Sequence, residues 1–198
     1  EHLVKLLNGE EIEVPTFDFK KGTKYYTGKT MKLEDDEVLV MEGIHCLNDE
    51  LTPAIDKNQK FKIYISALTV LNIDYYNRIS TTDTRIIRRT VRDSQFRGYD
   101  AIKTLSSWYS ISAGEEKNIF PFQEGADVMF NTSLVYEINA LKKYALPLFS
   151  QIGKEEKEYA EAKRLTEFLK YFEQIDIEDI PKNSLLREFI GGGIFDYD

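Results

Sequence analysis

Five arginines fall within the stretch "TDTRIIRRTVRDSQFRG", residues 82–98, of a chain whose formal net charge is −8. Their three- and four-residue steps predict a helix with one basic face. Four of the arginines share that face: Arg85, Arg88, Arg89 and Arg92. Guanidinium groups placed in this way converge on an anion, and they bind phosphate oxygens in bidentate geometry.

Two interpretations of this helix follow from spacing alone. A charged helix face ordinarily lies in solvent and pairs with nearby acids, and an exposed ion pair contributes only about 0 to 1 kcal/mol. The stretch itself contains two acids, Asp83 and Asp93, so most of its arginines have no local partner. Because a bound polyanion relieves such repulsion, an anion site stands beside the solvated face as the second interpretation.

A carboxylate ends the apolar run "VLVMEG", where Glu42 precedes Gly43. Open α/β sheets bind ligands beyond the carboxyl ends of their strands, so Glu42 is a candidate for holding Mg²⁺ directly or through water. An ordinary acid at the end of a strand is the alternative. His45 follows closely, as either a polar loop residue or a second member of this site.

Two aromatic side chains flank an acid in "VPTFDFKKGT". Phe17 and Phe19 would stack on a base, and the carboxylate of Asp18 would accept hydrogen bonds from hydroxyl groups. Strand alternation places the two phenylalanines on one face and the acid on the other, which fits packing in a core equally well.

Strands and helices alternate around these groups. Two short strands flank the turn signal Lys21-Gly22, and Gly28 predicts a second turn. Compact apolar runs predict strands buried on both faces of a parallel sheet. These runs span residues 37–44, 61–67 and 126–133. Helical patterns span residues 1–10, 82–98, 101–111, 137–149 and 154–175, with a short helix from Ser184.

The alternation predicts an α/β fold with a three-layer core and a helical tail. We expect residues 1–152 to form the α/β domain and residues 153–198 to form a helical C-terminal extension that packs on it. Hydrophobic residues make up 42% of the 198 residues, which indicates a folded chain. Cys46 is the one cysteine, and no apolar run of about 18 residues exists, so we expect a cytoplasmic protein without membrane partners. The net negative charge argues against broad nucleic-acid binding.

Six segments, in order and over about residues 1–150, resemble the uridine kinase/phosphoribulokinase family, and bacterial uridine kinase-like proteins in particular. The segments are "VPTFDF", "VLVMEGIHCLN", "FKIYISAL", "TDTRIIRRTVRDSQFRG", "FPFQEGADVMFNTS" and "VYEINALKKYALPLF". The tail "SLLREFIGG" is also similar to an ending found in that group.

The resemblance implies a P-loop NTPase fold with a mostly parallel sheet, and transfer of a phosphoryl group from ATP, with Mg²⁺, to a hydroxyl of a nucleoside or sugar substrate. By position it implies a metal-serving acid at Glu42 and a nucleoside pocket at Phe17 and Asp18. It also implies arginines that neutralise the transferring phosphate. These are Arg89, Arg92 and Arg97, with Arg85 beside them on the helix.

Several features depart from the family pattern. No G-x-x-x-x-G-K-[ST] occurs in the chain. The family's P-loop and general-base Asp would lie upstream of Glu1, so we expect this chain to be part of a kinase and inactive alone. Gly22, Tyr99 and Ser107 stand where uridine kinases carry His, Arg and Gln, which leaves the acceptor open. The alternatives are a non-catalytic anion- or RNA-binding module, and a structural domain that forms homo-oligomers through a sheet edge.

Overall fold

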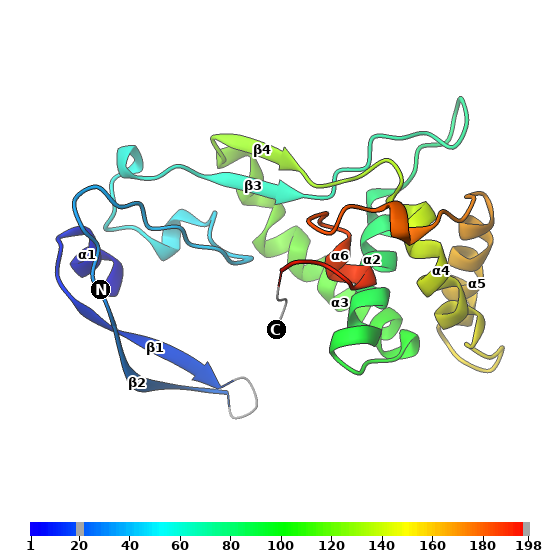
Figure 1. The fold of residues 1–198 in the computed structure, drawn as a ribbon, viewed down its shortest axis with the longest axis horizontal. Helices are drawn as coiled ribbons and strands as arrows, with labels where there is room; N and C mark the ends of the chain where they lie inside the picture. Colours follow the sequence, from blue (N-terminus) through cyan, green and yellow to red (C-terminus); the bar gives the residue numbers. More distant parts are fainter. Residues whose placement is uncertain (19–21, 196–198) are drawn as a thin grey trace. The chain divides into compact units, whose positions relative to one another are not determined.

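The computed structural model describes residues 1–18 and 22–195. It divides the chain into two compact units, Glu1–Lys62 and Ile63–Asp198, which are coloured blue to cyan and cyan to red in Figure 1. Phe19 lies outside the described residues, so the prediction that it binds substrate has no structural counterpart. None of the described helices is both long and apolar enough to cross a membrane.

The first unit begins with helix α1 (His2–Leu7) and an antiparallel hairpin of β1 (Ile12–Asp18) and β2 (Thr23–Met31). The predicted hairpin is therefore confirmed. The turn predicted at Gly28 is wrong, because Gly28 lies inside β2 with a φ of +79°. Pairing shifts there, and the Gly28 amide donates a hydrogen bond of 2.8 Å to the Glu13 carboxylate. Glycine supplies the left-handed backbone of a β-bulge at this position.

The rest of the first unit contains two short 3₁₀ helices, η1 (Asp49–Leu51) and η2 (Lys57–Gln59). The buried strand predicted over residues 37–44 is wrong: this segment has no regular structure, and Val38 and Val40 are 85% and 86% exposed. A strand of a parallel sheet needs neighbours that pair with its backbone. No strand among the described residues pairs with this segment, so its apolar composition alone does not produce a strand.

The second unit contains a parallel pair, β3 (Ile63–Ser66) and β4 (Val128–Asn131). Both predicted strands are confirmed, but their burial on both faces is wrong. Residues alternate between exposed and buried along β3, and β4 is exposed along its whole length. The described residues form a mixed α/β fold with two separate two-stranded sheets, and the expected three-layer P-loop NTPase-like core is not present among them.

Helices dominate the second unit. They are α2 (Thr81–Phe96), α3 (Ala101–Asn118), η3 (Phe120–Gly125), α4 (Glu137–Ser150), α5 (Tyr159–Lys170), η4 (Ile177–Asp179) and α6 (Arg187–Ile190). Helix α2 packs against α3, α4 and α6, and α4 packs against α5, as Figure 1 shows. Residues of α5 and α6 belong to the same hydrophobic core as those of α2 and α4. The expected domain boundary at residue 152 stays a prediction.

Helix α2 has the amphipathic character that its sequence predicts. The Ser80 hydroxyl caps its N-terminus by accepting the Asp83 amide at 3.4 Å, and Gly98 follows its end with a φ of +64°. The apolar side, including Ile87 and Val91, is fully buried in the core. The packing of that side fixes the direction in which the opposite, arginine-bearing face points.

Candidate anion site on the arginine helix

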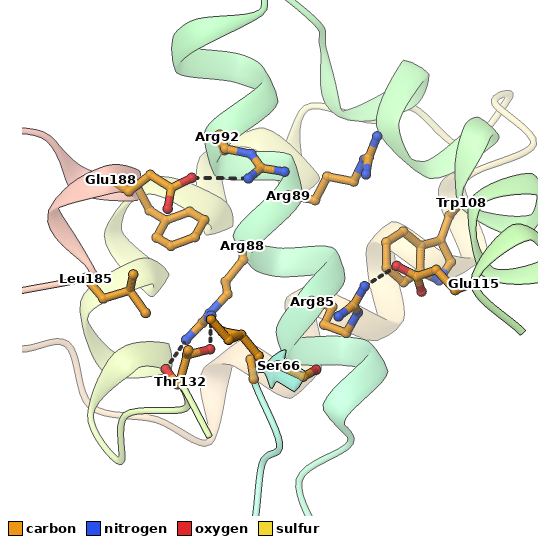
Figure 2. A pocket seen from close by; sticks show the side chains of 13 residues that line it. Ser66, Arg85, Arg88, Arg89, Arg92, Trp108, Glu115, Thr132, Leu185 and Glu188 are labelled. Atoms are coloured by element: carbon orange, nitrogen blue, oxygen red, sulfur yellow. Dashed lines mark hydrogen bonds and ion pairs between the residues drawn. The ribbon is translucent and has the colours of Figure 1, made fainter. Parts of the chain in front are cut away.

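An open cleft of about 300 Å³ lies along the arginine face of α2. Figure 2 shows the side chains that line it, which come from β3, α2, α3, α6 and the segments beside them. Four of the lining residues are arginines of α2: Arg85, Arg88, Arg89 and Arg92. The predicted site residue Arg97 follows the end of α2 and is not among the lining residues, so its role at the site stays a prediction.

Acids from other elements pair with three of these arginines. Arg85 contacts Glu115 of α3, and Arg88 contacts Glu137 of α4. Arg92 lies 3.1 Å from Glu188 of α6. These partners lie 30, 49 and 96 residues away in sequence. The stretch itself therefore does not reveal them. The arginines thus have few local partners, as the sequence indicates, but acids from distant elements relieve the repulsion that was expected among them.

The pair of Arg88 and Glu137 belongs to the interior of the unit. The Arg88 Nε donates to Glu137 at 2.9 Å, and its Nη2 also donates to the Thr132 carbonyl at 2.9 Å. Its guanidinium lies 5.4 Å from the centre of the Phe189 ring. Burial raises the pKa of the Glu137 carboxyl, and the neighbouring Arg88 opposes that rise. These contacts commit Arg88 to holding α2 against α4.

The guanidinium group of Arg89 makes fewer contacts with the protein than that of Arg88. It shares one buried carboxylate, Asp93, with Arg97: the Arg89 Nε lies 3.3 Å from it, and the Arg97 Nη1 donates to it at 2.9 Å. The Thr104 hydroxyl donates to the same carboxylate at 3.3 Å. One negative charge thus faces two positive charges. Within the described residues the terminal nitrogens of Arg89 make no hydrogen bond, so their donors are available to a ligand.

Three guanidinium Nε atoms on this face are buried and have no hydrogen-bond partner in the described part of the chain. They belong to Arg85, Arg89 and Arg92. A buried donor without a partner costs about 1 to 3 kcal/mol, and more when the group is charged. Because these Nε atoms are shielded from solvent, the terminal guanidinium nitrogens of the same arginines are the donors that an anion in the cleft would meet first. Figure 2 shows Arg92 directed toward Glu188 and Arg85 toward Glu115.

The other predicted site residues belong to the first unit. Phe17 and Asp18 end β1, with Phe17 49% exposed, and Glu42 and His45 lie in exposed segments. Among the residues that the structure describes, no three His, Cys, Asp or Glu side chains gather closely enough to hold a metal. The structure therefore brings together Arg85, Arg89 and Arg92. The predicted roles of the first-unit residues stay predictions.

The cleft residues that sequence reasoning missed include Trp108, Glu115 and Glu188. Trp108 and Glu115 are seven residues apart on α3, so they lie on one face of that helix. This spacing indicates that the two side chains can line the same surface. Glu188 had no comparable signal, since only the folded chain brings α6 to α2.

Comparison with known proteins gives a family and several relatives. The model of the "Phosphoribulokinase / Uridine kinase family" matches residues 1–138. A uridine kinase of Bacillus pumilus is 33% identical over 112 residues, which cover 56% of this chain and 44% of that protein. A uridine kinase of Staphylococcus haemolyticus is 29% identical over 131 residues, covering 65% of this chain and 54% of the relative. The chain thus spans about half the length of these curated relatives. No solved structure matches.

Proposed function

Because the chain belongs to the phosphoribulokinase/uridine kinase family, we propose that its arginine cleft binds the phosphate groups of a nucleotide during phosphoryl transfer to a small molecule. The observation that carries this proposal is the row of four arginines along the cleft, among which the terminal nitrogens of Arg89 make no hydrogen bond within the described residues. Negative charge spreads over the phosphate oxygens in the transition state of such a transfer, and fixed guanidinium groups stabilise it.

Each arginine has a distinct part in the proposed site. Arg89 makes the first contact with the anion, because Asp93 holds only its Nε and leaves both terminal nitrogens available. Arg85 and Arg92 flank it and contribute positive charge, although each also faces an acid of the protein. Arg88 lines the cleft but acts in the fold through its buried pair with Glu137.

The phosphoryl donor that fits this cleft is ATP, since its phosphates match the guanidinium donors in charge and geometry. When bound, ATP would supply the transferable phosphoryl group. Mg²⁺ commonly binds through one or two carboxylates together with the phosphates of a substrate. The described residues provide no metal cluster of their own, so we assign no step to Mg²⁺ and keep Glu42 as its proposed protein contact.

For the acceptor we propose a hydroxyl of a nucleoside or a related compound. Phe17 is half exposed at the end of β1, where its ring would stack on a base, and the adjacent Asp18 would accept hydrogen bonds from hydroxyl groups. His45 would contribute a further polar contact. Gly22 stands where uridine kinases carry a nucleoside-contacting His, and Tyr99 and Ser107 stand where they carry Arg and Gln, which favours an acceptor other than uridine itself.

The proposal is tested by titrating the chain with pyrophosphate. Trp108 is the one tryptophan of the sequence and lines the cleft, so its fluorescence reports binding there directly. We expect saturable binding that weakens by about tenfold or more in Arg89→Met, because charge-assisted hydrogen bonds are lost. Lys143→Met removes an equal charge from an exposed position of α4 and serves as the control.

Equal weakening by Arg89→Met and Lys143→Met would contradict the proposed site. The salt dependence of a second titration, with a single-stranded RNA, tests the alternative of an RNA-binding module. Tight RNA binding that falls steeply with salt would favour that alternative, since it reports the neutralisation of many phosphates. We expect weak RNA binding, because most arginines of α2 already face acids of the protein.

A further inference from the structure

The short helix α6 and Leu185, two residues before it, supply one wall of the cleft. Leu185, Glu188 and Phe189 all line it, and all three lie beyond the residues that the family model matches. Figure 2 shows Glu188 directed toward Arg92 across the cleft wall. The arginine helix and its C-terminal neighbour therefore form the site together.

Hydrogen bonds fix α6 in this place. The buried guanidinium of Arg187 donates to the carbonyl oxygens of Ile177 at 2.9 Å and Gly191 at 3.3 Å. The Tyr144 hydroxyl donates to the Ile190 carbonyl at 3.3 Å, which ties α6 to α4. With the backbone held at both ends, the Glu188 carboxylate stays beside the cleft.

The Glu188 carboxylate takes a position on Arg92 that a phosphate oxygen would otherwise take. Its Oε1 lies 3.1 Å from the Arg92 Nη1, and the two side chains are 27% and 32% exposed. Carboxylate and phosphate oxygens use the same guanidinium donors, so the two compete. Arg89, three residues earlier on the same face, has no such competitor on its terminal nitrogens.

We propose that Glu188 is a specificity-determining residue that lowers the affinity of the cleft for polyphosphates, because an anion that reaches the Arg92 Nη1 must displace the carboxylate. The inference rests on the proposed phosphate-binding function of the cleft. Side chains three residues apart on a helix lie about 5 to 6 Å from each other at Cβ. A single phosphate that binds the available terminal nitrogens of Arg89 leaves the pair of Arg92 and Glu188 intact.

A second, linked phosphate reaches Arg92. The charge of this second phosphate replaces the Glu188 carboxylate on Arg92. The carboxylate then turns into solvent, to which its side chain is already partly exposed. Glu188 thus weakens polyphosphate binding selectively, while orthophosphate binding at Arg89 is nearly independent of it. Glu188 consequently reduces the preference of the cleft for a di- or triphosphate group over orthophosphate.

The experiment compares Glu188→Gln with the unaltered chain in titrations with orthophosphate and with pyrophosphate, both followed by Trp108 fluorescence. We expect Glu188→Gln to bind pyrophosphate about fivefold more tightly, in line with the release of one partly exposed ion pair. Its affinity for orthophosphate should change by less than about twofold. Glu178→Gln changes the same charge at an exposed position of η4 and is the control.

Three results overturn the inference. An equal gain for both anions would show a general charge effect, and a gain shared with Glu178→Gln would show the same. Unchanged pyrophosphate binding in Glu188→Gln, with Arg89-dependent binding by the unaltered chain, would remove the role of Glu188 alone. Absence of binding in both proteins would overturn the proposed function as well. Equal thermal unfolding of the two proteins confirms that the substitution leaves the fold intact.

Discussion

The two units of the chain differ in how many of their hydrophobic side chains they bury. In the second unit, residues from Ile79 through α6 close a hydrophobic core in which Leu165 and Leu169 are fully buried. In the described part of the first unit, Leu6 and Ile12 are the buried hydrophobic residues, while Val38 and Val40 are exposed. Helices bury an apolar side against one another, whereas a buried strand depends on paired neighbours. The helical unit is therefore the one that holds a site in a fixed geometry.

Charged groups show the same contrast. The arginines of the second unit pair across elements with acids that are themselves half-buried or buried. In the first unit, Lys60 and Lys62 converge on Asp49 at 3.2 and 2.7 Å, but that carboxylate is 47% exposed. Solvent screens the exposed cluster, whereas removing one partner of a buried pair such as Arg88 with Glu137 leaves a buried charge without compensation.

The largest expected effect comes from breaking the buried pair in the second unit. Arg88→Met leaves the Glu137 carboxyl buried without its partner, and we expect the free energy of unfolding to fall by about 4 kcal/mol. Urea denaturation followed by circular dichroism measures the change. Arg97→Met, at a half-exposed position, should lower stability by no more than about 1 kcal/mol. Equal losses in both variants would contradict the distinction between buried and exposed pairs.

The next largest difference in stability between the two units is expected when an apolar side chain is shortened in each. Leu165→Ala leaves a cavity in the closed core, and we expect a loss of about 3 kcal/mol in urea denaturation. Val40→Ala, in the exposed segment of the first unit, should change stability by less than about 0.5 kcal/mol. A large loss in Val40→Ala would show that this segment is buried in solution and would remove the contrast.

The smallest effects are opposite dependences on pH. Burial raises the folded pKa of Glu137 above its ordinary value of 4.5, so its contribution to stability falls as pH rises from 4.5 through the folded pKa. Hydrogen bonds from Lys62 and Lys60 lower the pKa of Asp49 below 3.8, so its contribution is lost as pH falls through that lowered value. The free energy of unfolding is measured between pH 2 and 8. The dependence assigned to Glu137 should disappear in Glu137→Gln, and the dependence assigned to Asp49 should disappear in Asp49→Asn. Profiles unchanged from the unaltered chain would contradict these assignments.

Local patterns were sufficient to predict the helices of the second unit. The spacing in residues 82–98 gave the buried and the arginine faces of α2, because a helix satisfies its backbone within its own segment. Residues 37–44 failed as a strand, since sheet formation depends on partners that composition does not reveal. The acids Glu115, Glu137 and Glu188 were not predictable as partners of α2, because the tertiary fold alone brings them there.

The central claim is that an anion binds the arginine face of α2 through Arg89. Nuclear magnetic resonance of the arginine side-chain Nε–H groups tests it most directly, with Arg164, fixed on Asp83 by two hydrogen bonds outside the cleft, as the internal reference. We predict that pyrophosphate shifts the Arg89 resonance and, more weakly, those of Arg85 and Arg92, while Arg164 stays unchanged. An unshifted Arg89 resonance at saturating pyrophosphate, or equal shifts at Arg89 and Arg164, would contradict the account.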